Sequence, residues 1–222
     1  MNSELRTRTI SAVILGAAAL FITWWSAASF AVMCALGGVI LLKEWWGLTK
    51  HRSWWSMALG VLYIGAGVAA LICLRYLGIK TIFCLFALVW MADIAGYLVG
   101  KRFGKHKIAP TISPGKSWEG LAGSIVACAL LGGAYAVTQF SATPQNISTV
   151  LFCGVFAGSY AVIGLLGDLF ESALKRHAGV KDSGRLIPGH GGLFDRVDAL
   201  ISCAIFMALF FIILKVLDSY AV

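Results

Sequence analysis

Charged residues are scarce in this sequence. Asp, Glu, Lys and Arg make up 13% of its 222 residues, which is about half the share that is usual in a soluble domain. The mean hydropathy is correspondingly high, at +0.86. These two values argue against a water-soluble protein and favour a polytopic helical membrane protein.

Cysteine patterns typical of metal sites or of disulfide frameworks are also missing. The six cysteines all lie in apolar runs, and none forms a CxxC pair, so neither a zinc site nor a disulfide framework is indicated. Buried free thiols are the expected state. The net charge is +8, and in a membrane protein such an excess marks basic cytoplasmic loops more often than a nucleic-acid partner.

Long uncharged runs predict an all-α fold of about seven transmembrane helices with a cytoplasmic N-terminus. Residues 9–42 form a run of 34 residues without a charge, and one straight helix of that length would reach about 51 Å. Because the hydrocarbon core of a bilayer is about 30 Å thick, we expect two helices that meet near Trp24, Trp25 and Ser26. The other five spans are expected at about 54–74, 79–99, 119–139, 149–170 and 198–217.

The predicted fourth span carries small residues at every fourth position. These residues are Ala92, Gly96, Gly100 and Gly104. Such spacing lets another helix approach closely. The partner helix could belong to the same chain or to a second copy, so a homodimer is one of the two outcomes left open.

Lys and Arg are distributed unevenly between the predicted loops. With a cytoplasmic N-terminus, all but three of the 18 lie on the cytoplasmic side; the exceptions are Arg75, Lys80 and Lys215. This bias is a strong positive-inside signal. It also places two polar loops, 101–117 and 171–196, on the same cytoplasmic face.

One polar stretch, 167–198, interrupts the apolar C-terminal half. It holds five acids, five bases and two histidines, and charges placed against a bilayer usually mark a functional site. If the sixth span continues as a helix, one of its faces carries polar residues at helical spacing, namely Asp168, Glu171, Ser172 and Lys175. Acids followed by a base suit a metal-bound polyphosphate. The alternative is a solvated helix end with paired charges.

A second acidic pair, Asp195 and Asp198, opens the seventh span. Carboxylate oxygens suit Mg²⁺, whose coordination shell phosphates can complete. A transition metal is less expected, because His177 and His190 neither share a helix face nor stand beside cysteine. The glycine-rich residues 187–192 supply backbone N–H groups that could cradle a phosphate, although an ordinary connecting loop has the same composition.

The other polar loop ends in Gly115-Lys116-Ser117, which resembles part of a P-loop. It is not one, because that motif needs a glycine at position 110, where the sequence has Pro110. Lys116 and Ser117 could still bind phosphate at the start of the fifth helix. The alternatives are a helix N-cap for Ser117 and a simple cytoplasmic charge for Lys116.

Two further acids stand apart from these loops. Asp93 lies inside the fourth span, where it could bind metal or substrate, or could fix the packing of the helix. Glu44 follows Lys43 at a membrane edge, and a surface position is expected for it.

A pattern of specific residues runs through positions 172–198 without interruption. It consists of Ser172, Leu174, Lys175, Arg176, Lys181, Asp182, Gly184, Ile187, Pro188, His190, Gly191, Gly192, Leu193, Asp195, Arg196, Val197 and Asp198. These 27 residues resemble the signature of the phosphatidate cytidylyltransferases, also called CDP-diacylglycerol synthases. The resemblance extends to Asp93 with Tyr97, the turn from Gly100 to Gly104, residues 113–120, Gly167 with Asp168 and, in the N-terminal half, Glu44 with Trp45.

The resemblance implies an enzyme that joins CTP and phosphatidic acid to give CDP-diacylglycerol and pyrophosphate, with Mg²⁺ as cofactor. The residues implied as catalytic are Asp168, Lys175, Asp195 and Asp198. The implied Mg²⁺ ligands are Asp168 and Asp195, supported by Glu171 and Asp198. The implied substrate contacts are Asp93, Lys116, Ser117, Ser172, Arg176, Lys181, Asp182, His190 and Arg196.

The expected organisation is one integral membrane domain over 1–222. Residues 1–90 would supply N-terminal helices, and 91–222 would supply the catalytic helices and cytoplasmic loops. The expected location is the inner (cytoplasmic) membrane of a bacterium, with the active site on the cytoplasmic side and a membrane lipid as substrate.

Other function classes remain as alternatives. A related membrane nucleotidyl- or phosphotransferase would act on another lipid, such as a polyprenol. An ion transporter would be expected to spread its acids along the helices and often to contain internal repeats, whereas these acids gather with bases at one membrane face and no repeat is present. A non-catalytic lipid-binding relative would be expected to lose the acids.

Overall fold

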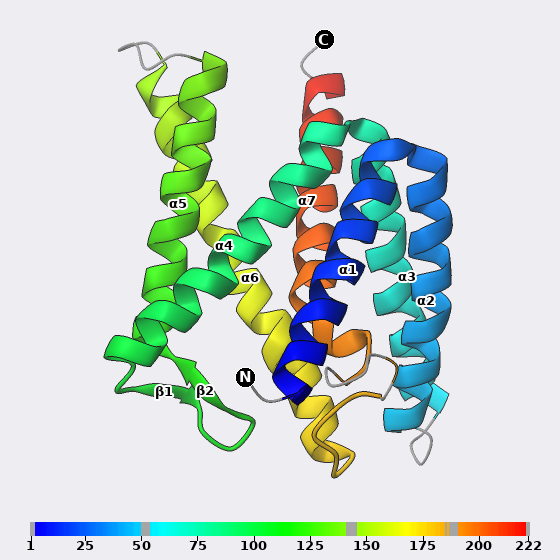
Figure 1. Cartoon of the computed structure of the whole chain (residues 1–222). Helices are drawn as coiled ribbons and strands as arrows, with labels where there is room; N and C mark the ends of the chain where they lie inside the picture. The colour runs from blue at the N-terminus through cyan, green and yellow to red at the C-terminus, as the bar shows by residue number, and fades with distance from the viewer. Residues whose placement is uncertain (1–2, 50–53, 141–145, 185, 187–190, 221–222) are drawn as a thin grey trace. The chain divides into compact units, whose positions relative to one another are not determined.

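The computed structural model describes residues 3–49, 54–140, 146–184, 186 and 191–220, with side chains from residue 14 onward except at 140 and 220. Helices make up most of this part of the chain (Figure 1). The elements are α1 (Ser3–Trp25), α2 (Ala27–Thr49), α3 (Trp54–Leu77), α4 (Ile79–Phe103), β1 (Lys107–Ala109), β2 (Ser113–Ser117), α5 (Trp118–Phe140), α6 (Ile147–His177) and α7 (Phe194–Tyr220). The predicted all-α membrane fold is confirmed, because α2 to α7 are each long and apolar enough to cross a membrane. The apolar part of α1, Ile14–Trp25, is shorter.

The first long apolar run is divided at Ser26, as predicted. The Ser26 hydroxyl oxygen accepts hydrogen bonds from the backbone N–H groups of Ala28 and Ser29, at 3.1 and 3.4 Å, so it caps the start of α2. At the end of α1, Arg75 donates from Nε to the carbonyl oxygen of Thr23 at 2.7 Å. Basic side chains favour the carbonyl end of a helix. Both sides of the break are therefore stabilised by hydrogen bonds.

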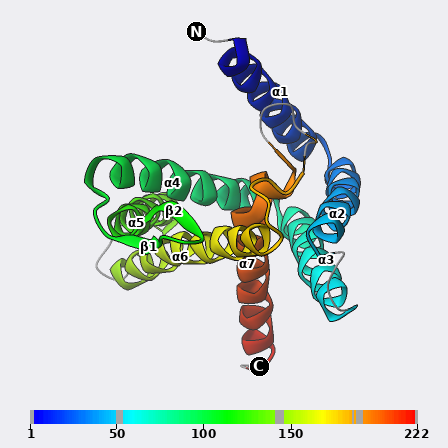
Figure 2. The same ribbon diagram turned by 90° about the horizontal axis from the view of Figure 1, so that it is seen from below.

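The chain divides into two compact units, which are described one at a time. The first comprises Met1–Ile82 and Ala173–Val222, and the second comprises Phe83–Ser172. In the first unit, α2 lies beside α3, and α3 packs on α7 (Figures 1 and 2). Trp45 of α2 is fully buried. Its indole N–H donates to the Ser56 carbonyl at 2.9 Å, and its ring centroid lies 6.0 Å from that of Phe194 on α7.

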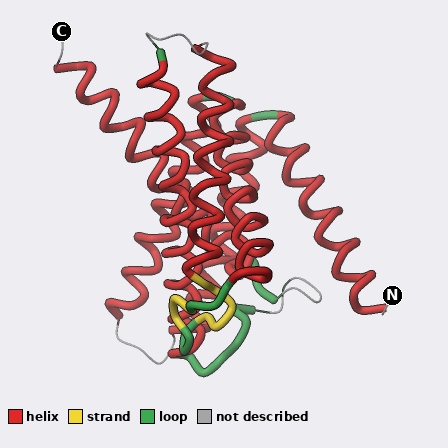
Figure 3. The backbone as a smooth tube through the Cα atoms, turned by 90° about the vertical axis from the view of Figure 1, so that its left-hand side faces the viewer, coloured by secondary structure: helices red, strands yellow, loops and turns green. Residues whose placement is uncertain are grey.

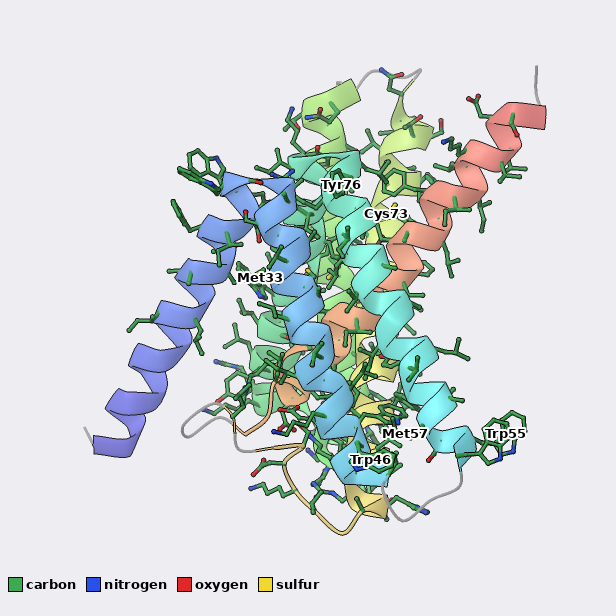
Figure 4. The ribbon with its side chains drawn as sticks, turned by 90° about the vertical axis from the view of Figure 1, so that its right-hand side faces the viewer. Met33, Trp46, Trp55, Met57, Cys73 and Tyr76 are labelled. Carbon is green, nitrogen blue, oxygen red and sulfur yellow. The ribbon has the colours of Figure 1, made fainter. Side chains whose placement is uncertain are left out.

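The outer face of α3 has the aromatic residues expected of a transmembrane helix. Trp55 lies near one end of α3 and Tyr76 near the other (Figure 4), with 66% and 65% of their surfaces exposed. Their separation of 21 residues corresponds to about 32 Å, which is close to the thickness of the hydrocarbon core. Aromatic rings at these two depths are typical of the membrane interfaces.

The cysteines are less uniformly buried than predicted. All six are free thiols, as expected, and Cys34, Cys128 and Cys203 are buried, but Cys73 on α3 is exposed. The prediction of burial was wrong for Cys73, because an apolar run in a membrane protein includes residues that face lipid as well as residues that face other helices.

In the second unit, small residues bring α4 and α5 into close contact. The Ser124 hydroxyl of α5 donates to the Ala92 carbonyl of α4 at 2.6 Å. A Cβ atom at Gly96 would lie 2.7 Å from that hydroxyl oxygen, and one at Gly120 would lie 2.9 Å from the Gly96 carbonyl oxygen. The close helix approach predicted from the four-residue spacing is confirmed, and the partner helix belongs to the same chain.

A short β-hairpin connects α4 to α5, and the sequence did not predict it. Strands β1 and β2 are antiparallel, with Lys107 opposite Ser117 and Ala109 opposite Ser113. Figure 3 shows the hairpin in yellow among helices in red. The Ser117 hydroxyl oxygen accepts the Gly120 N–H at 3.2 Å, which confirms Ser117 as the N-cap of α5.

Gly60 of α3 is expected to be intolerant of a larger side chain. A Cβ atom there would lie 2.2 to 2.4 Å from indole atoms of Trp45, a rigid ring held by Ser56. Overpacking of this kind typically costs about 1–3 kcal/mol. We expect Gly60→Ala to lower the Tm of the purified protein in detergent. Gly65, on the same helix, has nothing within 4 Å of its added Cβ, so Gly65→Ala is the matched control. Equal Tm values for the two variants would contradict this packing.

Candidate active site

One group of polar residues surrounds the start of α7. We call it the glycine-loop cluster, and its members are Glu44, Lys175, Ser183, Gly192 and Asp195. Lys175, at the end of α6, donates to Asp195 Oδ1 at 2.6 Å. The other oxygen, Oδ2, accepts the backbone N–H groups of Ser183 at 2.9 Å and of Gly192 at 2.8 Å, and the Ser183 hydroxyl lies 3.0 Å from it. With side-chain exposures of 11% and 8%, Lys175 and Asp195 form a buried and hydrogen-bonded ion pair.

Two glycines allow the backbone to approach Asp195 so closely. Gly191 has φ of +84°, a conformation that favours glycine. A Cβ atom there would lie 2.7 Å from Asp195 Oδ2 and 3.3 Å from the Asp182 Cβ. At Gly192, an added Cβ would lie 2.1 Å from the Ser183 hydroxyl oxygen. In the described part of the glycine-rich loop, the Gly192 N–H donates to a carboxylate, which accords with the alternative of a connecting loop; binding of phosphate by this loop stays a prediction.

Glu44 belongs to this cluster, and the prediction that it lies on the surface was wrong. Only 9% of the residue is exposed. Its carboxylate accepts the backbone N–H groups of Leu193 and Phe194, each at 2.8 Å, and the Ser183 hydroxyl at 2.9 Å. Glu44 is buried by tertiary contacts, because its partners lie 139 to 150 residues after it in the sequence. One signal was available in the sequence: Glu44 is the only acid between Glu4 and Asp93.

A second group of polar residues lies in the other unit. We call it the hairpin cluster, and its members are Asp93 of α4, Lys116 of β2 and Asp168 of α6. Lys116 donates from Nζ to Asp168 Oδ2, with side-chain exposures of 37% and 14%. The charge of Asp93, whose side chain is exposed, interacts with the charges of both residues. The unit thus brings together two acids and one lysine that the sequence had singled out separately.

The hairpin is also joined to the start of α5 by a polar contact. Glu119 accepts the His106 backbone N–H at 3.2 Å, and its carboxylate lies 2.7 Å from the His106 Nδ1 atom. The Trp118 N–H donates to the His106 carbonyl at 3.0 Å. These bonds hold β2, and with it Lys116, in a fixed position relative to α5.

Helix α6 continues through the polar residues that follow its apolar run, as predicted. It ends at His177, so Asp168, Glu171 and Lys175 share one helix face. Only 1% of Glu171 and 9% of Lys175 is exposed. The alternative of a solvated helix end is therefore wrong for these two residues.

The remaining predicted site residues differ in their exposure. Arg176, Lys181, Asp182 and Arg196 are exposed, Ser172 and Asp198 are partly buried, and Ser117 is buried. His190 lies outside the described residues, as do Ile187 and Pro188. Arg176 lies at the end of α6 and Arg196 at the start of α7.

The donor atoms of both clusters suit Mg²⁺ rather than a transition metal. The acidic residues supply carboxylate oxygens, and no group of three or more His, Cys, Asp or Glu side chains is arranged as a metal cage in the described ranges. Mg²⁺ is commonly bound through one or two carboxylates, with water and substrate phosphates as its other ligands. Carboxylates beside lysines are the groups that such an arrangement of ligands would need.

Known proteins are similar to this chain in sequence. A profile of the cytidylyltransferase family matches residues 47–214. A phosphatidate cytidylyltransferase of Brucella suis biovar 1 is 32% identical, over 94% of this chain and 93% of the relative. One of Haemophilus influenzae is 37% identical over 76% and 66%, and one of Mycobacterium bovis is 45% identical over 56% and 39%. The similarity to the first relative therefore includes the N-terminal helices.

Proposed function

Because this chain belongs to the cytidylyltransferase family, we propose that it transfers CMP from CTP to phosphatidic acid, giving CDP-diacylglycerol and pyrophosphate for phospholipid synthesis. The observation that carries the proposal is the similarity to a phosphatidate cytidylyltransferase along nearly the whole length of both chains. The uninterrupted signature over residues 172–198 supports it. Integration into the membrane also suits an enzyme with a lipid substrate.

The reaction replaces one phosphoanhydride bond with another. An oxygen of the phosphatidate phosphate attacks the α-phosphorus of CTP, and a new P–O bond forms. The bond from the α-phosphorus to the oxygen bridging it to the β-phosphorus breaks, and pyrophosphate leaves with that electron pair. Because a phosphate monoester is already ionised near neutral pH, no strong general base is needed. Catalysis then rests on positioning and on charge stabilisation.

The two clusters supply the groups that such a reaction needs. We assign Asp168, supported by Glu171, in one unit and Asp195, supported by Asp198, in the other unit as the residues that would hold Mg²⁺. The bound ion would offset negative charge on the phosphates. Lys116 and Lys175 are paired with carboxylates, and each would donate hydrogen bonds to a phosphate bound beside that carboxylate.

Exposed bases would then guide the two anionic substrates. Arg176, Lys181 and Arg196 are all exposed, and guanidinium and ammonium groups donate strong hydrogen bonds to phosphate oxygens. Ser172, on the polar face of α6, would donate a hydrogen bond. Asp182, beside Gly191, would orient these bases.

A direct assay tests the proposed function. Purified protein in detergent is incubated with CTP labelled at the α-phosphate, Mg²⁺ and phosphatidic acid, and a lipid-linked CMP product is expected. Parallel reactions replace phosphatidic acid with a polyprenyl phosphate, or omit Mg²⁺ and add EDTA. Product with the polyprenyl phosphate alone would instead establish the related transferase as the function. No lipid product from either acceptor, under conditions in which a known synthase works, would refute the proposal.

We infer that the N-terminus and the active site face the cytoplasm, in the inner membrane of a bacterium. The excess of Lys and Arg in alternate loops supports this orientation. A single cysteine placed at Ser141 in a cysteine-free variant is expected to react with an impermeant thiol reagent added to intact cells, whereas one placed at Lys107 is expected to react only after lysis. The reverse pattern would contradict the orientation.

A further inference from the structure

Glu44 occupies an unusual place for an acid in the N-terminal half of a membrane protein. It precedes Trp45, the fully buried residue whose indole bonds to α3 through Ser56 and contacts Phe194 of α7. This anchoring fixes the backbone of α2 at Glu44. The carboxylate is thus held beside the start of α7 by packing that does not depend on its charge.

The Glu44 carboxylate caps a helix that lies far away in sequence. The first N–H groups of any helix have no acceptor within that helix, and a carboxylate at this end also favours the helix dipole. At the start of α7, Glu44 accepts two backbone N–H groups: Phe194, the first residue of the helix, donates to Oε2, and Leu193, the residue just before it, donates to Oε1, each at 2.8 Å. A cap is ordinarily supplied by the residue just before the helix. Here α2 supplies it.

The cap is joined directly to Asp195. Phe194 and Asp195 are adjacent, and the Ser183 hydroxyl lies between the two carboxylates, 2.9 Å from Glu44 and 3.0 Å from Asp195. A hydroxyl carries one proton, so Ser183 donates to one of them at a time. The loop packs tightly on Glu44 as well, since a Cβ atom at Gly184 or Gly192 would lie 2.8 or 2.5 Å from its oxygens.

We propose that Glu44 is a positioning residue of the enzyme, which caps α7 from α2 and thereby holds Asp195 in its working orientation. This inference rests on the proposed function for the reaction that Asp195 serves. It assigns to the N-terminal helices a part in catalysis beyond anchoring the protein in the membrane.

Glu44→Gln is the decisive variant. Its side chain is nearly the same size, but the amide NH₂ would face one of the two backbone N–H donors. Hydrogen–deuterium exchange of the purified protein should then become about 10-fold or more faster at the amides of Leu193 and Phe194, because a buried donor left without its acceptor destabilises the local structure. The kcat should fall about 10- to 100-fold, with KM for CTP and for phosphatidic acid within about threefold of the wild-type values.

Two further variants make the test specific. Ser183→Ala keeps both amide hydrogen bonds, so exchange at Leu193 and Phe194 should stay at the wild-type rate. Asp218→Asn makes the same carboxylate-to-amide change at an exposed position near the other end of α7, and neither exchange nor kcat should change. Peptides from α3 should keep their wild-type exchange in every variant.

Several outcomes would overturn the proposal. In Glu44→Gln, unchanged exchange at the start of α7 would show that Glu44 does not cap this helix. Faster exchange throughout α3 would indicate general unfolding. An altered KM with unchanged kcat would mean that Glu44 contacts substrate instead. If Ser183→Ala accelerates exchange as much as Glu44→Gln, the loop and not the cap holds α7. If wild-type protein makes no lipid product, the proposed function fails, but the exchange measurements still decide whether Glu44 holds the start of α7.

Discussion

Asp195→Asn is expected to lower the kcat for lipid-linked CMP formation by about 1,000-fold, a loss typical of removing a preorganised electrostatic group from an active site. One carboxylate oxygen accepts a hydrogen bond from Lys175, and the other accepts hydrogen bonds from the backbone N–H groups of Ser183 and Gly192. An asparagine has only one accepting oxygen, and its NH₂ group would face donors. The variant also removes the proposed Mg²⁺ ligand and leaves the buried Lys175 without its counter-charge, which is costly in itself.

Two further measurements distinguish a loss of catalysis from a loss of folding. The variant protein should be extracted from the membrane in normal amounts and should elute as the same species as wild type in gel filtration. Asp218→Asn, an exposed carboxylate on the same helix, provides the control and should keep wild-type activity. A kcat for Asp195→Asn within threefold of that of wild type, a difference of less than about 1 kcal/mol, would show that Asp195 is not a catalytic residue.

Lys116→Ala is expected to lower kcat/KM for CTP by about 100-fold, since a charge-assisted hydrogen bond contributes roughly 1.5–3 kcal/mol. Lys116 pairs with Asp168, and its charge interacts with that of Asp93. We assign to Lys116 a phosphate of CTP, so its loss leaves two acids beside that phosphate. Repulsion between these acids and CTP should raise KM for CTP more than KM for phosphatidic acid. Initial rates at varied CTP and at varied phosphatidic acid measure the two effects.

The hairpin itself provides the control for Lys116. Lys107 lies on β1, opposite Ser117 in the strand register, and its side chain is exposed. Lys107→Ala removes the same charge from the same two-stranded sheet, and it should change kcat/KM less than about threefold because an exposed charge contributes little. Equal losses in the two variants would mean that the net positive charge of the hairpin matters, and not the pairing of Lys116 with Asp168.

The helices could be predicted from the sequence because their determinants are local. An uncharged run too long for one bilayer crossing required a break near Ser26, and Ser26 caps the helix that follows. Four-residue spacing of small side chains predicted a close helix contact, and Ser124 and Gly120 of α5 provide it. The polar face of α6 followed from helical periodicity once the helix was extended past Asp168.

The contacts that organise the glycine-loop cluster could not be predicted in this way. Glu44 bonds to residues up to 150 positions away, and no spacing rule relates such distant residues. The hairpin was missed for a different reason. Strand β2 has the sequence Ser-Pro-Gly-Lys-Ser, whose proline and glycine are unfavourable in strands, so its conformation depends on pairing with β1 and on the bonds of His106 to Glu119 and Trp118.

The length of α6 has a consequence for how the lipid is used. Residues 147–167 carry no charge and span about 31 Å as a helix, which matches the hydrocarbon core, so we expect Asp168 at the depth where the acyl chains end and the lipid phosphates begin. Pulling a diacyl lipid into water would cost about 0.8 kcal/mol for each exposed CH₂ group. With the proposed site at headgroup depth, phosphatidic acid would react while both of its chains stay in the bilayer, and the product would diffuse away laterally. Only CTP and pyrophosphate then need to cross between water and the enzyme.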